Sequence, residues 1–321
     1  MERQLQTCEP LVGNDANVAT PVPGGASSDQ PDASSRQRDV RASGNMKIEV
    51  LNFGVSGYST AQQLITLRER VWTYSPDLVL LTITTNNDIT DNSRGLKRTD
   101  EIPYFVYHSG QLVFDDSFKT SRPFRLRQSF ISQVGRWLKD HLRLVQAINE
   151  GHRGLKVLLA SLKERWKSSE SASGSETALR SEELGIDNLI YSAPTSPLWS
   201  DAWNVTEHLI KQMSDEVKDR GARFVVITLS NPPQVVPSPK SREAFMERLG
   251  VKGLFYPDNR IRLFAERAGI TVITLAPELQ AYAEQKNIFL HGFGPNIGNG
   301  HWNADGHRAA GEIIARKLCG Q

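Results

Sequence analysis

The chain has 321 residues, a mass of 35.8 kDa and a formal charge of +2, which 38 basic and 36 acidic residues produce. Because the charges nearly balance, the overall charge favours neither a nucleic acid nor an acidic partner. No apolar run is long enough for a transmembrane helix, and residues 1–30 lack the apolar core of a signal peptide. These absences predict a cytoplasmic protein, unless an upstream signal or anchor is missing. Cys8 and Cys319 lie near opposite ends of the chain, and we expect both to be free thiols.

Small and polar residues dominate residues 1–46, where Gly, Pro, Ser, Asp and Asn are frequent. Such a segment buries too little apolar surface to offset the entropy that ordering removes. We therefore expect residues 1–45 to form a disordered tail and residues 46–321 to form one α/β domain. The hydrophobic content of 39% fits a chain that is partly unpacked.

The first predicted elements follow the order strand, helix, strand. The run KIEVLNF (47–53) is typical of a β-strand. Apolar residues at helical spacing come next, with Ser59 or Thr60 as the expected N-cap. DLVLLTI (77–83) is a continuous apolar run, as expected for a strand that is covered on both faces. This order predicts a parallel pair of strands with a right-handed crossover.

Residues at about 100–200 interrupt the α/β pattern and are predicted to form a mostly helical insertion or cap. YFVYHSGQLVF (104–114) predicts a β-hairpin around Ser109-Gly110, and residues 122–167 predict two amphipathic helices. Residues 119–167 contain 12 Lys or Arg and 3 Asp or Glu, so these basic helices could contact an anionic membrane. We favour a solvated cap, because no uninterrupted amphipathic stripe carries all of the charge.

The α/β pattern returns after residue 200. Asn204 and Glu207 resemble a capping box at the start of a helix that Gly221 closes. The elements expected after it are a strand at 223–229, a helix at about 259–268, a strand at 270–275 and a final helix within 301–318, capped at Asn303.

Three polar segments lie directly after predicted strands or before the final helix, at residues 52–59, 84–92 and 300–308. Ligands bind at the carboxyl ends of the strands in an open parallel sheet, so these positions suit a site. In the first segment, Gly57 allows the backbone to turn tightly and to point an N–H group at an anion. An ordinary strand-to-helix turn explains the glycine as well.

The other two segments carry an amide and two histidines. Asn87 can donate to a developing oxyanion, a contact worth about 3 kcal/mol, although Asn and Asp also cluster in ordinary turns. His301 and His307 precede or begin a helix, and a loop histidine can act as a general base; a structural role explains a single loop histidine as well. His291 and Asp305 add to this group, but the spacing matches no known metal site, and we expect no metal.

Together the segments resemble sequence blocks of the SGNH/GDSL hydrolase family. NFGVSG is similar to its second block, NND to its third and GHWNADGH to its fifth, and the likeness covers roughly residues 46–100 and 200–321. The resemblance implies a three-layer α/β/α sandwich with a parallel, flavodoxin-like sheet. It also implies hydrolysis of lipid or acetylated-carbohydrate esters through a serine acyl-enzyme, without a metal or organic cofactor. Carried over, Gly57 and Asn87 would form the oxyanion hole, and His301 would be the base.

The block that carries the family's nucleophile is absent. That Gly-Asp-Ser block lies on the family's first strand, and no such triplet is found upstream of the second block. Ser56 is a weaker candidate, because Gly57 comes one residue too early for a GxSxG turn. In the family topology the first strand would lie between residues 47–53 and 77–83, so its absence would leave costly unpaired backbone groups. We therefore treat residues 1–45 as a candidate non-native tail.

Two further positions depart from the family pattern. Gly298 stands where an Asp usually precedes the histidine, which leaves Asp305 as a weaker candidate carboxylate, with His307 as a further weaker candidate. Asn86 replaces the glycine that is usual in the third block. Two alternatives stay open: a catalytically inactive remnant of the fold that binds glycans or esters, and a peripheral membrane protein that uses residues 122–167.

Overall fold

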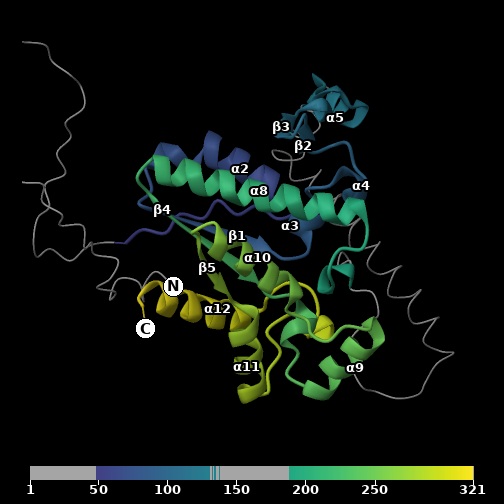
Figure 1. Ribbon diagram of the computed structural model, residues 1–321, viewed down its shortest axis with the longest axis vertical. Helices are drawn as coiled ribbons and strands as arrows, with labels where there is room; N and C mark the ends of the chain where they lie inside the picture. The colour runs from purple at the N-terminus through teal and green to yellow at the C-terminus, as the bar shows by residue number, and fades with distance from the viewer. Residues whose placement is uncertain (1–47, 131, 133, 135–136, 138–187, 321) are drawn as a thin grey trace, which may run out of the picture.

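The computed structural model describes residues 48–130, 132, 134, 137 and 188–320. Three parallel strands form a sheet in the order β1-β4-β5, as Figure 1 shows. They are β1 (Leu78–Thr84), β4 (Arg223–Leu229) and β5 (Thr271–Thr274). The sheet confirms the expected α/β class and three of the four strands that the sequence predicts for it.

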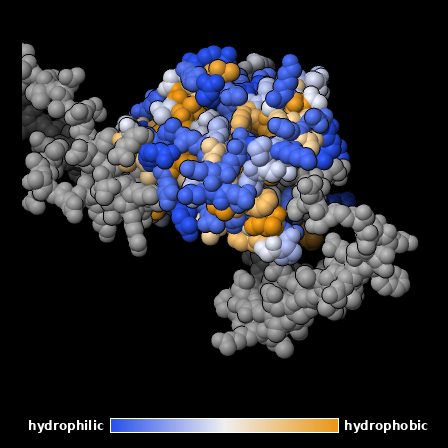
Figure 2. Space-filling view, turned by 90° about the horizontal axis from the view of Figure 1, so that it is seen from below, coloured by the Kyte–Doolittle hydropathy of each residue, from blue (hydrophilic) through white to orange (hydrophobic). Residues whose placement is uncertain are grey.

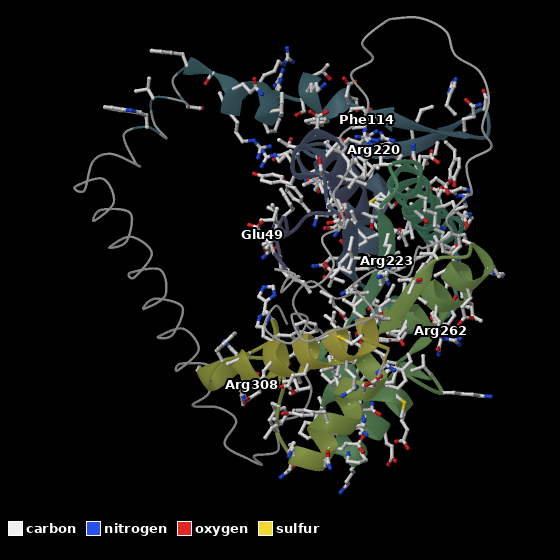
Figure 3. All side chains as sticks on the ribbon, turned by 90° about the vertical axis from the view of Figure 1, so that its left-hand side faces the viewer. Glu49, Phe114, Arg220, Arg223, Arg262 and Arg308 are labelled. Atoms are coloured by element: carbon white, nitrogen blue, oxygen red, sulfur yellow. The ribbon has the colours of Figure 1, made fainter. Side chains whose placement is uncertain are left out.

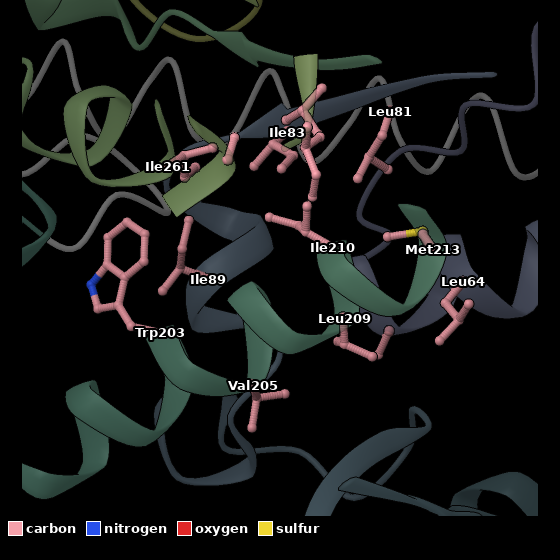
Figure 4. Close-up of a cluster of buried hydrophobic side chains, with 14 of the residues drawn as sticks. Leu64, Leu81, Ile83, Ile89, Trp203, Val205, Leu209, Ile210, Met213 and Ile261 are labelled. Carbon is pink, nitrogen blue, oxygen red and sulfur yellow. The ribbon is translucent and has the colours of Figure 1, made fainter. Parts of the chain in front are cut away.

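Alternating side chains of the central strand β4 face two helical layers. The helices on the first face are α2 (Thr60–Glu69), α8 (Pro197–Asp219) and α10 (Tyr256–Arg267), and those on the second are α11 (Ala276–Lys286) and α12 (Ala304–Leu318). Phe224 and Val226 join the apolar cluster of the first face, part of which Figure 4 shows. Val225 and Ile227 join the cluster of the second face. Helices therefore cover both faces of the sheet, which is compatible with a three-layer arrangement.

The remaining described elements are short. They are α3 (Asn87–Thr90), α4 (Arg94–Lys97), β2 (Tyr104–His108), β3 (Gln111–Asp115), α5 (Arg122–Gln128), α9 (Pro239–Leu249) and the 3₁₀ turns η2 (Val71–Tyr74), η3 (Ser117–Thr120), η4 (Asn188–Tyr191), η5 (Pro232–Val235) and η6 (Gly294–Asn296). Strands β2 and β3 form the predicted hairpin, and its turn residues Ser109 and Gly110 have positive φ angles of 50° and 81°. The hairpin and α5 lie at one end of the molecule, away from the sheet (Figure 1).

Two helix starts are placed by the caps that the sequence predicts. Ser59 caps α2, and its backbone N–H donates to Gln62 Oε1 at 3.1 Å. Asn303 caps α12, and its Oδ1 accepts the backbone N–H groups of Asp305 and Gly306, both at 3.0 Å. Both caps satisfy backbone donors that have no partner inside the helix.

The predicted capping box of Asn204 and Glu207 is wrong. Helix α8 begins at Pro197, and Ser196 Oγ accepts the backbone N–H of Trp199 at 3.4 Å. Asn204 therefore lies within the helix. Proline suits the first helical position because its missing N–H would be unpaired there anyway.

The strand predicted at 47–53 is also wrong for residues 48–53, which lie outside any strand. In the described part of the chain, no backbone hydrogen bond joins them to β1 or to another strand. Val50 and Leu51 are 37% and 44% exposed. A strand exists only where a neighbouring strand pairs with it, and among the described residues this segment has no such neighbour.

Several expectations concern the surface and the ends of the chain. Within the described residues, every helix is too short or too polar to cross a bilayer. The face shown in Figure 2 is largely hydrophilic, with apolar residues scattered over it. Cys319, at the end of α12, is disulfide-bonded, so the prediction of a free thiol is wrong there. The predicted tail (1–45) and residues 138–187 of the predicted insertion lie outside the described residues.

Candidate functional site

The carboxyl ends of β1 and β4 carry a group of buried polar side chains. Thr85, Asn86 and Asp88 follow β1, while Ser230 and Asn231 follow β4. None of these side chains is more than 5% exposed. Asn231 Nδ2 donates to Thr85 Oγ1 at 3.0 Å, which ties the two strand ends together. Burying polar groups is unfavourable unless they are hydrogen-bonded. A concentration of buried polar side chains therefore makes this end of the sheet a candidate site.

A buried carboxyl group fixes the turn after β4. Thr228 Oγ1 and Gln234 Nε2 donate to the two carboxyl oxygens of Asp258, each at 2.6 Å. Burial raises the pKa of Asp258 to about 6, although the hydrogen bonds from Thr228 and Gln234 oppose this shift. Gln234 Oε1 also accepts the backbone N–H of Asn231 at 2.7 Å. The turn that carries Ser230 and Asn231 is therefore held in one geometry.

The loop between α11 and α12 folds back on itself and carries His301. His291 and Trp302 form an antiparallel β-bridge. Beside it, the Gly292 N–H donates to the His301 carbonyl oxygen at 2.8 Å. The backbone of His301 is therefore fixed, while its side chain is exposed.

A serine–histidine hydrogen bond joins this loop to the end of β4. His291 Nδ1 lies 2.7 Å from the Gly300 carbonyl oxygen, so Nδ1 carries the proton. The other ring nitrogen, Nε2, then accepts the Ser230 hydroxyl at 3.1 Å. Trp302 Nε1 donates to the same hydroxyl oxygen at 2.8 Å. Because Gly300 directly precedes His301, these bonds anchor the backbone that presents His301.

The histidine of this pair is held neutral. Burial lowers the pKa of His291 to about 4, and the nearby His301 and His307 lower it further, while the Gly300 carbonyl opposes the shift. A serine hydrogen-bonded to a neutral histidine has the arrangement of a nucleophile and its base. Here, however, His291 is 4% exposed and Ser230 is 5% exposed. In this conformation the pair serves to anchor the loop.

The sequence did not predict this pair. Ser230 is not among the predicted site residues, and His291 belongs only to a group whose spacing matches no known metal site. One signal could have indicated Ser230, since Ser-Asn directly follows a buried apolar strand at a carboxyl end. Nothing in the sequence indicates that Trp302 covers it.

The residues predicted for the oxyanion hole lie on the surface. Gly57 has a φ of +78° in the turn closed by the bond from the Tyr58 N–H to the Val55 carbonyl (3.2 Å). Asn87 is the first residue of α3, and its side chain is exposed, as is Ser56. Within the described residues, no hydrogen bond joins His301 to any of these three predicted residues.

Asp88 lies beside Asn87 and is fully buried. Its Oδ2 accepts the backbone N–H of Thr84 at 2.6 Å. Burial raises the pKa of Asp88 to about 8, and the neighbouring Asp91 adds to this, while hydrogen bonds with Thr84 and Gln63 oppose it. Asp88 is therefore largely protonated at neutral pH.

The two weaker candidates in the last segment have other contacts. Asp305 Oδ1 accepts Arg308 Nη1 at 3.1 Å, and Figure 3 labels Arg308 at the start of α12. The His307 ring packs edge-on against Trp302, with 5.7 Å between the ring centroids. In the described ranges, no three His, Cys, Asp or Glu side chains are grouped so that they could hold a metal ion.

A cavity of about 310 Å³ lies elsewhere, between α8 and α10. Its lining is Glu207, Tyr256, Asn259, Arg260, Leu263 and Arg267. Two of its charged residues are paired, since Arg260 Nε donates to Glu207 Oε1 at 2.7 Å. Because none of the predicted site residues lines this cavity, we place the candidate site at the carboxyl ends of the strands.

The comparisons with known proteins identify no relative. No protein-family model, no curated protein and no solved structure matches the chain. A functional assignment therefore rests on the sequence segments and on the contacts described above.

Proposed function

We propose that this chain is an SGNH/GDSL-type ester hydrolase, built on a three-layer α/β/α sandwich, that acts on lipid or acetylated-carbohydrate esters. The observation that best supports this is the exposed His301, on a backbone that the His291–Ser230 network anchors to the end of β4. A general base must be within reach of the substrate and must be held in position. The exposed side chain and the anchored backbone of His301 support this role.

In the proposed reaction a serine hydroxyl attacks the acyl carbon while His301 takes its proton. The ester C–O bond then breaks, the alcohol leaves with the proton from His301, and the acyl group stays on the serine. Water, activated by His301, later hydrolyses the acyl-enzyme and releases the acid. The Gly57 N–H and the Asn87 amide donate to the oxyanion of the tetrahedral intermediate. In the described structure the Asn87 side chain makes no hydrogen bond, so its N–H groups are available to a ligand. Ser56 is exposed and adjoins Gly57, which makes it the first serine to test. This chemistry needs neither a metal nor an organic cofactor.

The second candidate function is the binding of glycans or esters without turnover. One observation favours it. Ser230, which is hydrogen-bonded to a histidine, is buried and bonded to Trp302, so a substrate does not reach it in this conformation. An inactive protein would keep the polar carboxyl-end site and use it for recognition alone.

The test is hydrolysis of p-nitrophenyl acetate and butyrate by the purified chain. We expect His301→Ala to lower kcat/KM by about 10²–10⁴-fold, since it removes the base. His108→Ala is the control, because it removes another exposed histidine, on β2 and outside the candidate site, and we expect it to change the rate little. Ser56→Ala should abolish hydrolysis if Ser56 is the nucleophile.

Two results would contradict this proposal. Hydrolysis that His301→Ala leaves unchanged would remove His301 from the reaction. A folded wild-type chain that neither hydrolyses the esters nor reacts with a fluorophosphonate probe would favour binding without turnover.

A further inference from the structure

A helical segment at one end of the molecule exposes large apolar side chains. It begins with α5, which lies away from the sheet together with β2 and β3 (Figure 1). Leu126 on α5 is 69% exposed, and Phe130, just after this helix, is 79% exposed. Val134 and Trp137 follow and are 36% and 56% exposed. Apolar side chains that gather on the surface in this way indicate an interaction site.

On α5 the exposed apolar side chain points away from the rest of the molecule. Phe124 packs edge-on against Phe118, with 5.0 Å between the ring centroids, so this side of α5 is turned inward. Leu126 comes two residues later, about 200° around the helix, and therefore faces outward. Arg122 precedes Leu126 by one turn and lies on the same side. The outward side of α5 thus combines a cation with an apolar group.

A second outward-facing apolar group follows Ser129, where α5 ends. Phe130, Val134 and Trp137 are helical, and their spacing of i, i+4 and i+7 places them on one face. Ser132 lies on the opposite side of this helical segment and is partly buried. A solvated cap would turn its apolar face inward and its polar face outward. Here the apolar face is the exposed one.

Positive charge surrounds these apolar side chains. Residues 117–137 contain five Lys or Arg and no Asp or Glu. Lys119 and Arg127 pair with acidic residues that precede this segment. Arg122 and Arg125 are exposed, and among the described residues neither has a carboxylate partner. The exposed residues of 122–137 therefore form a surface that is both basic and apolar, which we call the basic apolar face.

We propose that the basic apolar face binds the surface of an anionic phospholipid bilayer. Its aromatic and aliphatic side chains would enter the boundary between headgroups and acyl chains, and its arginines would contact the lipid phosphates. Charge complementarity favours this partner, because a bilayer presents anionic groups and an apolar layer at one boundary. A nucleic acid would leave Leu126 and Val134 without an apolar contact. The proposal does not depend on the hydrolase assignment.

Co-sedimentation of the full chain with lipid vesicles tests the proposal. The vesicles contain phosphatidylcholine and phosphatidylserine at about three to one, and vesicles of phosphatidylcholine alone are the comparison. We expect the anionic vesicles to bind the chain about tenfold more tightly or better. Raising the salt concentration should weaken this binding, because salt screens the arginines. His301→Ala should bind as the wild type does, so failure of the hydrolase proposal would leave this result unchanged.

The apolar contact is tested by Phe130→Ser combined with Trp137→Ser. We expect this double variant to bind anionic vesicles about tenfold more weakly or worse, since it removes two aromatic side chains from the face. Phe293→Ser is the control, because it removes a phenylalanine that is 62% exposed elsewhere on the molecule. Lipids brominated in their acyl chains should quench the fluorescence of Trp137. Trp137→Phe should keep the binding and lose this part of the quenching.

The charge contact is tested by Arg122→Glu combined with Arg125→Glu, which should remove the preference for anionic vesicles. Lys252→Glu combined with Arg267→Glu is the matched control, because it changes the net charge equally at two other exposed positions. We expect this control to keep the preference.

Three results would overturn the proposal: no binding to anionic vesicles, binding that both double variants of the face leave unchanged, or an equal loss in the controls. Self-association that Phe130→Ser with Trp137→Ser removes, without any binding to vesicles, would instead assign the face to a second copy of the chain.

Discussion

Asp88 is the residue whose protonation most directly couples stability to pH. Burial raises its pKa from 3.8 to about 8, so the folded chain keeps a proton that the unfolded chain releases. The free energy of unfolding therefore falls as pH rises from the unfolded pKa of 3.8 to the folded pKa of about 8. Asp88→Asn keeps an acceptor for the Thr84 N–H and does not titrate. We expect this variant to be more stable than the wild type at pH 8, on the order of 1–3 kcal/mol, by urea denaturation.

The comparison belongs between pH 6.5 and pH 8, because two other buried groups titrate below that range. His291 has a pKa lowered to about 4, so its contribution to stability is lost as pH falls from 6.5 toward 4. Asp258 has a pKa raised to about 6, so the loss of stability that its ionisation causes is largely complete by pH 6.5. If Asp88→Asn and the wild type lose stability equally between pH 6.5 and pH 8, Asp88 is not the buried acid that we describe.

Sequence predicts single residues well where their partners are local. The caps Ser59 and Asn303 bond to backbone groups within three residues, and both were predicted correctly. The Ser230 hydroxyl bonds to His291, 61 positions away, and to Trp302, 72 positions away. Such partners are brought together by the fold, so no local pattern indicates them.

At the scale of elements, the loop that carries His301 rests on the first turn of α12 at a glycine. A Cβ atom added to Gly306 would lie 2.2 Å from the Leu290 carbonyl oxygen and 3.1 Å from the Trp302 Cβ. Gly306→Ala should therefore push the loop away and destabilise the chain by about 1–3 kcal/mol. We also expect it to lower any hydrolysis that depends on His301.

Gly253→Ala is the matched control for this variant, because a Cβ atom there meets nothing within 4 Å. The free energy of unfolding from urea titrations measures both. Equal effects of the two substitutions would show that the loop does not rest on α12 at Gly306.

Some of the apolar segments that predict a β-strand form one in the structure, and one does not. DLVLLTI and RFVVITL were predicted as strands, and both pair in the sheet. KIEVLNF also has several apolar residues, although Lys47, Glu49 and Asn52 interrupt them, and residues 48–53 form no strand. Apolar character predicts that a segment can be a strand, whereas pairing requires a neighbour that the pattern does not supply.

At the scale of the whole molecule, the alternation of strands and helices predicted a parallel sheet with helices on it. That alternation did not predict the strand order β1-β4-β5. The order depends on whether each connection between strands returns the chain to one edge of the sheet or to the other. A break in the pattern predicted an insertion at about 100–200, and β2, β3 and α5 are described within that range. The local signals therefore indicated the fold class, while the strand order required the structure.

The two helical layers share one sheet, so they should unfold together. Leu209 on α8 and Leu279 on α11 are both fully buried, in the clusters of opposite faces. We expect Leu209→Ala and Leu279→Ala each to lower the free energy of unfolding by about 2–5 kcal/mol. Because the side chains lie in separate clusters, the double variant should show their sum to within about 0.5 kcal/mol. A single urea transition should persist in all three variants. A second transition in either single variant would show that the layers fold independently and that β4 does not couple them.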